Sequence, residues 1–132
     1  MPIDQVTEKF VRDWFDLLST HAPIDQLLPF IATDELEMEF PERTLHSHAD
    51  VRDWYLAVGD SYTGQDHIVE KIDATPSRTG TDLDVTVVWK AEQTSDGARL
   101  AFRVNQSWHL ADSAKTGRPL IVKYHVLSLR DL

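Results

Sequence analysis

The spacing of apolar residues changes near Gly64, and this change constrains the fold more than any other feature of the chain. Before Gly64, apolar residues recur three and four positions apart, which is the spacing of one helix face. After it they alternate with polar residues, as in strands that bury one face. The chain is therefore predicted to be α+β, with N-terminal helices that pack on a strongly curved antiparallel sheet and enclose an apolar pocket.

Three helices are predicted in the first half of the chain. The first covers about residues 4–21, and a short one lies within the proline-bounded segment 23–29. The third begins after Ser47, which opens a capping box, and runs toward Gly64. Between the second and third helices, residues 36–40 alternate strictly, which predicts a half-buried strand.

The second half is predicted to form four long strands, over about residues 66–75, 82–94, 99–111 and 119–130. A two-residue turn at Asp96-Gly97 joins the middle two strands in this prediction and sets their register. The residues placed opposite each other are Trp89 and Val104, Val87 and Gln106, and Val85 and Trp108. They share one largely apolar face, which needs the helices as its cover.

Charge and composition exclude several classes of function. The formal net charge is -9, from 22 acidic and 13 basic residues, and a field of this sign repels nucleic acids and anionic membranes. Cysteine is absent, which excludes disulfides and thiolate catalysis and suits a reducing cytoplasm. The chain shows no secretion signal and no apolar run near the roughly 18 residues of a membrane helix. We therefore expect one cytoplasmic domain spanning residues 1–132.

Four stretches of the chain resemble one superfamily. They are residues 10–15, Trp54-Tyr55 leading to 67–69, residues 108–110, and residues 121–126. With this order of elements, the chain is similar to the SnoaL-like branch of the nuclear-transport-factor-2-like superfamily. The resemblance implies a cystatin-like cone in which three N-terminal helices pack on a highly curved antiparallel sheet around a cavity. Known members include dehydratases, isomerases, cyclases and epoxide hydrolases as well as inert binding modules, so the resemblance implies a pocket rather than one activity.

His67 is the leading catalytic candidate. Several SnoaL-like proteins and dehydratases of similar architecture place a histidine that looks into the cavity at this point, and imidazole titrates near neutral pH. The alternative is an idle, hydrogen-bonded histidine at the rim of the sheet. The resemblance also implies polar pocket partners near Asp13 and Asp16, where Phe15 stands in place of the expected tyrosine.

Gln106 and Tyr124 are the other catalytic candidates, because each places a polar group on the predicted apolar face. A buried amide without a partner costs roughly 1 to 3 kcal/mol, so Gln106 needs a ligand, a water or a neighbouring side chain. The hydroxyl of Tyr124 can orient a carbonyl or a phenol, or simply cap the core. The residues predicted to bind a ring-containing ligand, with core packing as the alternative, are Trp14, Trp54, Tyr55, Trp89 and Trp108.

Neither a cofactor nor a metal is predicted. Phosphate-binding glycine loops and dinucleotide fingerprints are missing from the sequence. His46 and His48 lie close together, but two ligands without a third make a weak metal site.

These features predict a cofactor-independent lyase or isomerase, of the dehydratase or cyclase type, that uses general acid/base chemistry on a small hydrophobic, oxygenated molecule. The alternative is a non-catalytic ligand-binding protein or a dimeric assembly module. Val88, Ile68 and Leu127 are predicted to face outward, which favours a homodimer.

Overall fold

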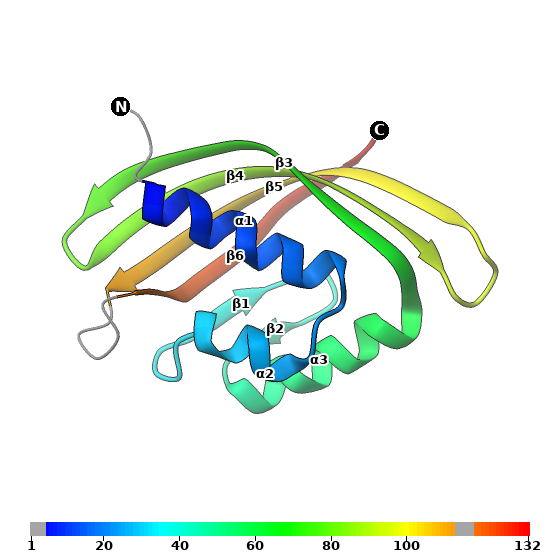
Figure 1. The fold of residues 1–132 in the computed structure, drawn as a ribbon, viewed down its shortest axis with the longest axis horizontal. Helices are drawn as coiled ribbons and strands as arrows, with labels where there is room; N and C mark the ends of the chain where they lie inside the picture. Colours follow the sequence, from blue (N-terminus) through cyan, green and yellow to red (C-terminus); the bar gives the residue numbers. More distant parts are fainter. Residues whose placement is uncertain (1–4, 113–117) are drawn as a thin grey trace.

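The helices lie on the concave side of a bent six-stranded sheet in the computed structural model, which describes residues 5–112 and 118–132 (Figure 1). The helices are α1 (Gln5–Ser19), α2 (Ile24–Leu27) and α3 (His48–Ser61), and a 3-10 turn, η1 (Leu28–Phe30), follows α2 directly. The strands are β1 (Glu37–Glu39), β2 (Thr44–Leu45), β3 (Tyr62–Ser77), β4 (Gly80–Gln93), β5 (Arg99–Asp112) and β6 (Pro119–Asp131). The predicted α+β cone is confirmed.

The first helix, α1, forms where the sequence carries one apolar stripe. Its buried residues include Phe10, Val11, Trp14, Phe15 and Leu18. Just beyond its end, His21 adopts a left-handed backbone conformation (φ 49°), and its ring stacks on that of Tyr55 at 4.2 Å. The Tyr55 hydroxyl donates to the carbonyl of Ala22 at 2.6 Å, so α3 is attached to the end of α1. None of the described helices has the length and apolarity that crossing a membrane requires.

Both ends of α3 are held by hydrogen bonds. The Ser47 hydroxyl accepts from the backbone N–H of Asp50 at 3.1 Å, which confirms the predicted N-cap. At the other end, the Thr94 backbone N–H donates to the carbonyl of Ser61, and the Thr94 hydroxyl donates to that of Asp60. Thr94 begins the loop between β4 and β5, so this loop caps the last turn of α3.

The six strands follow the order β2-β1-β6-β5-β4-β3. All neighbours are antiparallel except β1 and β6, which run parallel, so the sheet is mixed. Strands β4, β5 and β6 were predicted within two residues of their observed bounds, whereas β3 begins at Tyr62, four residues earlier than predicted. The two-residue strand β2 was not predicted, because it is too short for any periodicity to be detected.

The register between β4 and β5 differs from the prediction by two residues. Trp89 pairs with Phe102 and Val87 with Val104, rather than with Val104 and Gln106. The turn spans residues 94–97, because the Gln93 backbone bonds to the carbonyl of Ala98 and leaves four residues in the loop. A shift of two residues keeps every side chain on its predicted face, so the apolar and polar faces are sorted as expected.

Irregular pairing bends the long strands around the helices. The β3–β4 ladder shifts register between Thr63 and Asp66 and again between Val69 and Lys71. Extra residues of this kind increase the local twist and bend of a strand. Figure 1 shows the long strands arching over the helices.

Candidate functional site

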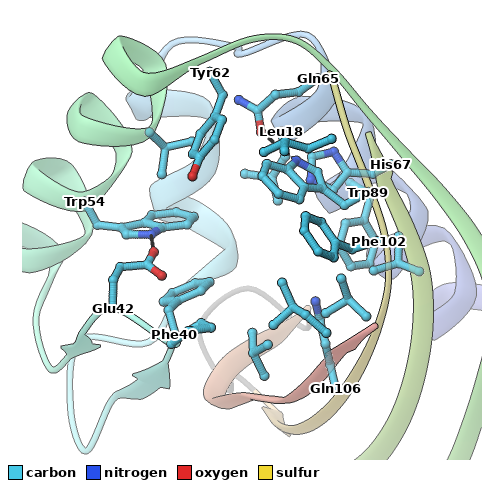
Figure 2. Close-up of a pocket in the computed structure, with 18 of the residues that line it drawn as sticks. Leu18, Phe40, Glu42, Trp54, Tyr62, Gln65, His67, Trp89, Phe102 and Gln106 are labelled. Carbon is cyan, nitrogen blue, oxygen red and sulfur yellow. Dashed lines mark hydrogen bonds between the residues drawn. The ribbon is translucent and has the colours of Figure 1, made fainter. Parts of the chain in front are cut away.

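A cavity of about 390 Å³ lies between the helices and the inner face of the sheet (Figure 2). Its wall comes from α1, α3, the turn after β1, and strands β3 to β6. The exposed residues of the lining are Pro41, Glu42 and Leu129, so the cavity opens to solvent beside them. This volume lies within the range of small-molecule sites, roughly 300 to 1,000 Å³.

Three of the five predicted aromatic wall residues line the cavity: Trp54, Tyr55 and Trp89. Trp14 and Trp108 do not, and their prediction as ligand contacts is corrected. They are 0% and 1% exposed and pack around Tyr124, with ring centroids 6.0 and 4.7 Å from its ring. These two indoles are therefore part of the core rather than of the cavity wall.

His67 lines the cavity from β3 and is held from behind by α1. Its backbone N–H donates to the hydroxyl of Ser19 at 2.9 Å, and its ring Nδ1 lies 3.0 Å from the same oxygen. The ring also stacks on Phe15, with centroids 5.5 Å apart. The other ring nitrogen, Nε2, has no hydrogen-bond partner among the described residues and is therefore available to a ligand.

Burial changes the proton affinity of His67. It lowers the pKa of the ring from 6.5 to about 4, because the charged form loses hydration. No salt bridge to His67 occurs within the described part of the chain to offset this loss. The imidazole is therefore neutral at neutral pH, and its free nitrogen carries either a proton or a lone pair.

Gln106 and Tyr124 both line the cavity, from β5 and β6 respectively. Gln106 is 6% exposed, and its Oε1 accepts from the Trp108 indole at 2.8 Å, so a neighbouring side chain satisfies the amide oxygen. Figure 2 shows the amide nitrogen directed toward the interior of the cavity. Burial raises the pKa of Tyr124 to about 12, and Trp14 and Gln106 offset this only in part. The Trp14 indole lies near the Tyr124 hydroxyl but meets hydrogen-bond geometry with no described residue.

Ser19, Glu42 and Gln65 are site residues that the sequence did not identify. Glu42 accepts from the indole of Trp54 at 3.2 Å, and Gln65 accepts from the indole of Trp89 at 3.1 Å. Both side chains come from loop or strand-start positions whose direction no periodicity reveals. Ser19 is 48 positions from His67, and only the packing of α1 on β3 brings them together.

The cavity wall carries one carboxylate and no basic side chain other than His67, as far as the described residues show. That carboxylate is Glu42. Asp13 and Asp16, the acidic partners implied by the resemblance, lie elsewhere: Asp13 pairs with Lys9 at 2.8 Å, and Asp16 is exposed outside the cavity. A wall of this charge disfavours an anionic ligand.

The histidines weighed as metal ligands have structural partners. Nδ1 of His46 bonds to the Leu36 carbonyl at 3.2 Å, and Nε2 of His48 bonds to the Ile31 carbonyl at 3.0 Å. A different group, Glu37, Glu39 and His125, brings its ligand atoms within 4.8 Å of one another where β1 pairs with β6. It is partly exposed, and His125 already bonds to Glu37 at 2.6 Å.

Comparisons with known proteins identify the fold. Neither a family model nor a curated protein sequence matches the chain. Among solved structures, a nuclear transport factor 2 (NTF2-like) superfamily protein from Salmonella enterica has a TM-score of 0.82 at 12% identity, over 96% of this chain and 89% of that one. A hexachlorocyclohexane dehydrochlorinase has a TM-score of 0.81 at 11% identity, over 96% and 86%. A ketosteroid isomerase-like protein from Erwinia carotovora atroseptica has a TM-score of 0.75 at 16% identity, over 93% and 95%. The chain therefore has the NTF2-like fold.

Proposed function

We propose that this protein binds a small, electrically neutral ring compound in its cavity and acts on it as a cofactor-independent lyase or isomerase of the SnoaL-like type. The observation that carries the proposal is the cavity itself, which combines aromatic walls with a few hydrogen-bonding groups. The similar folds named above include a dehydrochlorinase and an isomerase-like protein, which supports this class of reaction.

The chemistry we propose is proton transfer between the ligand and two groups on opposite walls. His67 and Glu42 are the lining residues suited to this role, and Figure 2 shows them on opposite sides of the cavity. One group can remove a proton from carbon while the other stabilises the oxygen of the ligand. Gln106 and Tyr124 are proposed to orient that oxygen, and Trp54, Tyr55 and Trp89 to hold the ring.

Exchange of hydrogen for deuterium at carbon tests this proposal before any natural substrate is known. With ring ketones such as 1-tetralone in D₂O, we expect the protein to accelerate exchange next to the carbonyl, and mass spectrometry measures it. His67→Gln and Glu42→Gln should each reduce that acceleration about 100-fold, a typical effect of removing a proton-transfer group. His109→Gln and Glu39→Gln make the same chemical changes at residues outside the cavity lining and should leave it intact. A panel of ring ketones with no accelerated exchange would contradict the enzymatic proposal.

Binding without turnover is the second candidate. It is favoured by the way the polar groups of the wall are already occupied, since Glu42, Gln65 and Gln106 each accept a bond from an indole. In that case ring compounds raise the melting temperature and none is consumed.

A homodimer remains a prediction. On the outer face of the sheet, Ile68 and Leu127 are 44% and 62% exposed, whereas Val88 is 5% exposed and is not available to a partner as predicted. Sedimentation velocity at several protein concentrations measures the assembly state, and a monomer at all of them would contradict the prediction.

A further inference from the structure

Ser19, the last residue of α1, makes two contacts with His67. Its hydroxyl oxygen accepts from the backbone N–H of His67 at 2.9 Å and lies 3.0 Å from Nδ1 of the ring. A serine hydroxyl has one proton and two lone pairs. Because the backbone bond uses a lone pair, the hydroxyl proton still needs an acceptor, and Nδ1 is the one that the described residues supply.

The direction in which the Ser19 hydroxyl donates its proton determines which ring nitrogen of His67 carries the proton of the neutral imidazole. If Ser19 donates to Nδ1, then Nδ1 presents a lone pair, and the proton of the neutral ring lies on Nε2. The opposite tautomer turns an N–H toward the hydroxyl and leaves the hydroxyl proton unmatched among the described residues. Among the described residues, no carboxylate is bonded to the His67 ring and could favour the other tautomer: Asp13 is paired with Lys9, and Asp16 lies outside the cavity lining.

Two glutamines give independent evidence about the polarity of the cavity. An indole N–H can only donate, so the Trp89 and Trp108 bonds oblige Gln65 and Gln106 to turn their amide oxygens to the indoles. The amide nitrogen of Gln65 is then left as a donor, whereas that of Gln106 donates to the Tyr124 hydroxyl, which lowers the pKa of that phenol. Both residues line the cavity, as His67 does. The hydrogen-bonding groups that His67 and Gln65 still have available to a ligand are therefore donors.

We infer that Ser19 is a positioning residue that holds His67 in the Nε2–H tautomer, so that the cavity recognises a neutral ring compound through a hydrogen-bond acceptor such as a ketone oxygen. This inference rests on the proposed function and makes its ligand class specific. Glu42, the carboxylate of the wall, disfavours an anion of the same shape. A hydrocarbon of that shape fills the cavity but leaves the donors unmatched.

The tautomer is measured directly by long-range ¹H–¹⁵N correlation spectra of the full chain at neutral pH. We expect His67 to show a protonated Nε2 and an unprotonated Nδ1. Ser19→Ala removes the hydroxyl and should give a mixture of tautomers, whereas Ser19→Thr retains a hydroxyl and should restore the native spectrum. A His67 that is protonated on Nδ1 in the native protein overturns the inference.

Ligand selectivity is measured with three probes of closely similar shape: 2-isopropenylnaphthalene, 2-acetylnaphthalene and 2-naphthoate. In the native protein, we expect the ketone to bind about tenfold more tightly than the hydrocarbon, which is the effect of one well-formed hydrogen bond. The naphthoate should bind most weakly. Ser19→Ala should reduce the advantage of the ketone several-fold while the affinity for 2-isopropenylnaphthalene stays unchanged, and Ser19→Thr should preserve that advantage.

The probes separate failure of this inference from failure of the proposed function. Equal binding of the ketone and the hydrocarbon to the native protein, or an advantage that Ser19→Ala leaves intact, contradicts the role of Ser19 while the cavity still binds ring compounds. If none of the three probes binds, the proposed function fails and the inference fails with it.

Discussion

Gly80→Ala is expected to prevent the chain from folding to its native state under ordinary conditions. Gly80 begins β4 with φ +158° and pairs with Ala111 of β5. A Cβ built at this position lies 1.8 Å from the backbone carbonyl oxygen of Leu110, far inside van der Waals contact. That oxygen belongs to a central strand and cannot move without breaking the ladder, so the loss of stability should exceed about 4 kcal/mol. Urea denaturation followed by circular dichroism measures it.

Gly64→Ala provides the matched control for this substitution. Gly64 also has a positive φ, +60°, but nothing lies within 4 Å of a Cβ added there. Only the backbone strain of a left-handed alanine remains, which costs roughly 1 to 2 kcal/mol. If the two variants lost similar stability, the steric argument for Gly80 would be wrong.

Acid is expected to destabilise the protein through His67 by on the order of 3 kcal/mol, because burial lowers the pKa of this ring from 6.5 to about 4. Between these two values the unfolded chain binds more protons than the folded chain, so the free energy of unfolding falls as pH falls from about 6.5 to about 4. Above pH 6.5 the ring is neutral in both the folded and the unfolded chain, so His67 no longer makes the free energy of unfolding depend on pH.

His67→Gln isolates this contribution from other titrating groups. Glu70, whose pKa is lowered by its hydrogen bond with Arg103, adds its own loss of stability in acid, but it does so in both proteins. Urea midpoints at pH 4, 5, 6 and 7 should therefore fall more steeply in the native protein than in the variant. Parallel pH profiles would show that His67 is hydrated in the folded state.

The sequence predicted the fold because its two periodicities differ and are each sustained over many residues. The amphipathic stripe of α1 and the alternation in the four long strands each specify one buried face. The β4–β5 register was not predictable from Asp96-Gly97, because Asp96 accepts from the backbone of Ala98 at 3.0 Å within a four-residue loop rather than a two-residue turn. Such local hydrogen bonds select the turn type, and apolar pattern does not contain them.

The candidate site was predictable only where a side chain's face followed from its strand. Gln106 and Tyr124 were placed on the inner face by alternation, and both line the cavity. Trp14 and Trp108 were also placed on apolar faces. Whether such a side chain lines the cavity or packs in the core depends on how far along its helix or strand it lies, and periodicity gives only the face. Ser19 was missed because its contact with His67 depends on where α1 crosses β3.

The attachment of the β4–β5 loop to α3 has a consequence for how a ligand reaches the cavity. Two bonds from Thr94, at 3.0 and 2.6 Å, tie that loop to the end of the helix, and Gln93 beside it belongs to the cavity wall. We therefore expect exchange with solvent beside the short turn from Phe40 to Arg43, where Pro41 and Glu42 are exposed and one backbone bond of 2.9 Å joins Phe40 to Arg43. The rate at which a ring compound comes and goes should then depend on the stiffness of that turn, so a substitution such as Pro41→Gly should change residence time more than affinity.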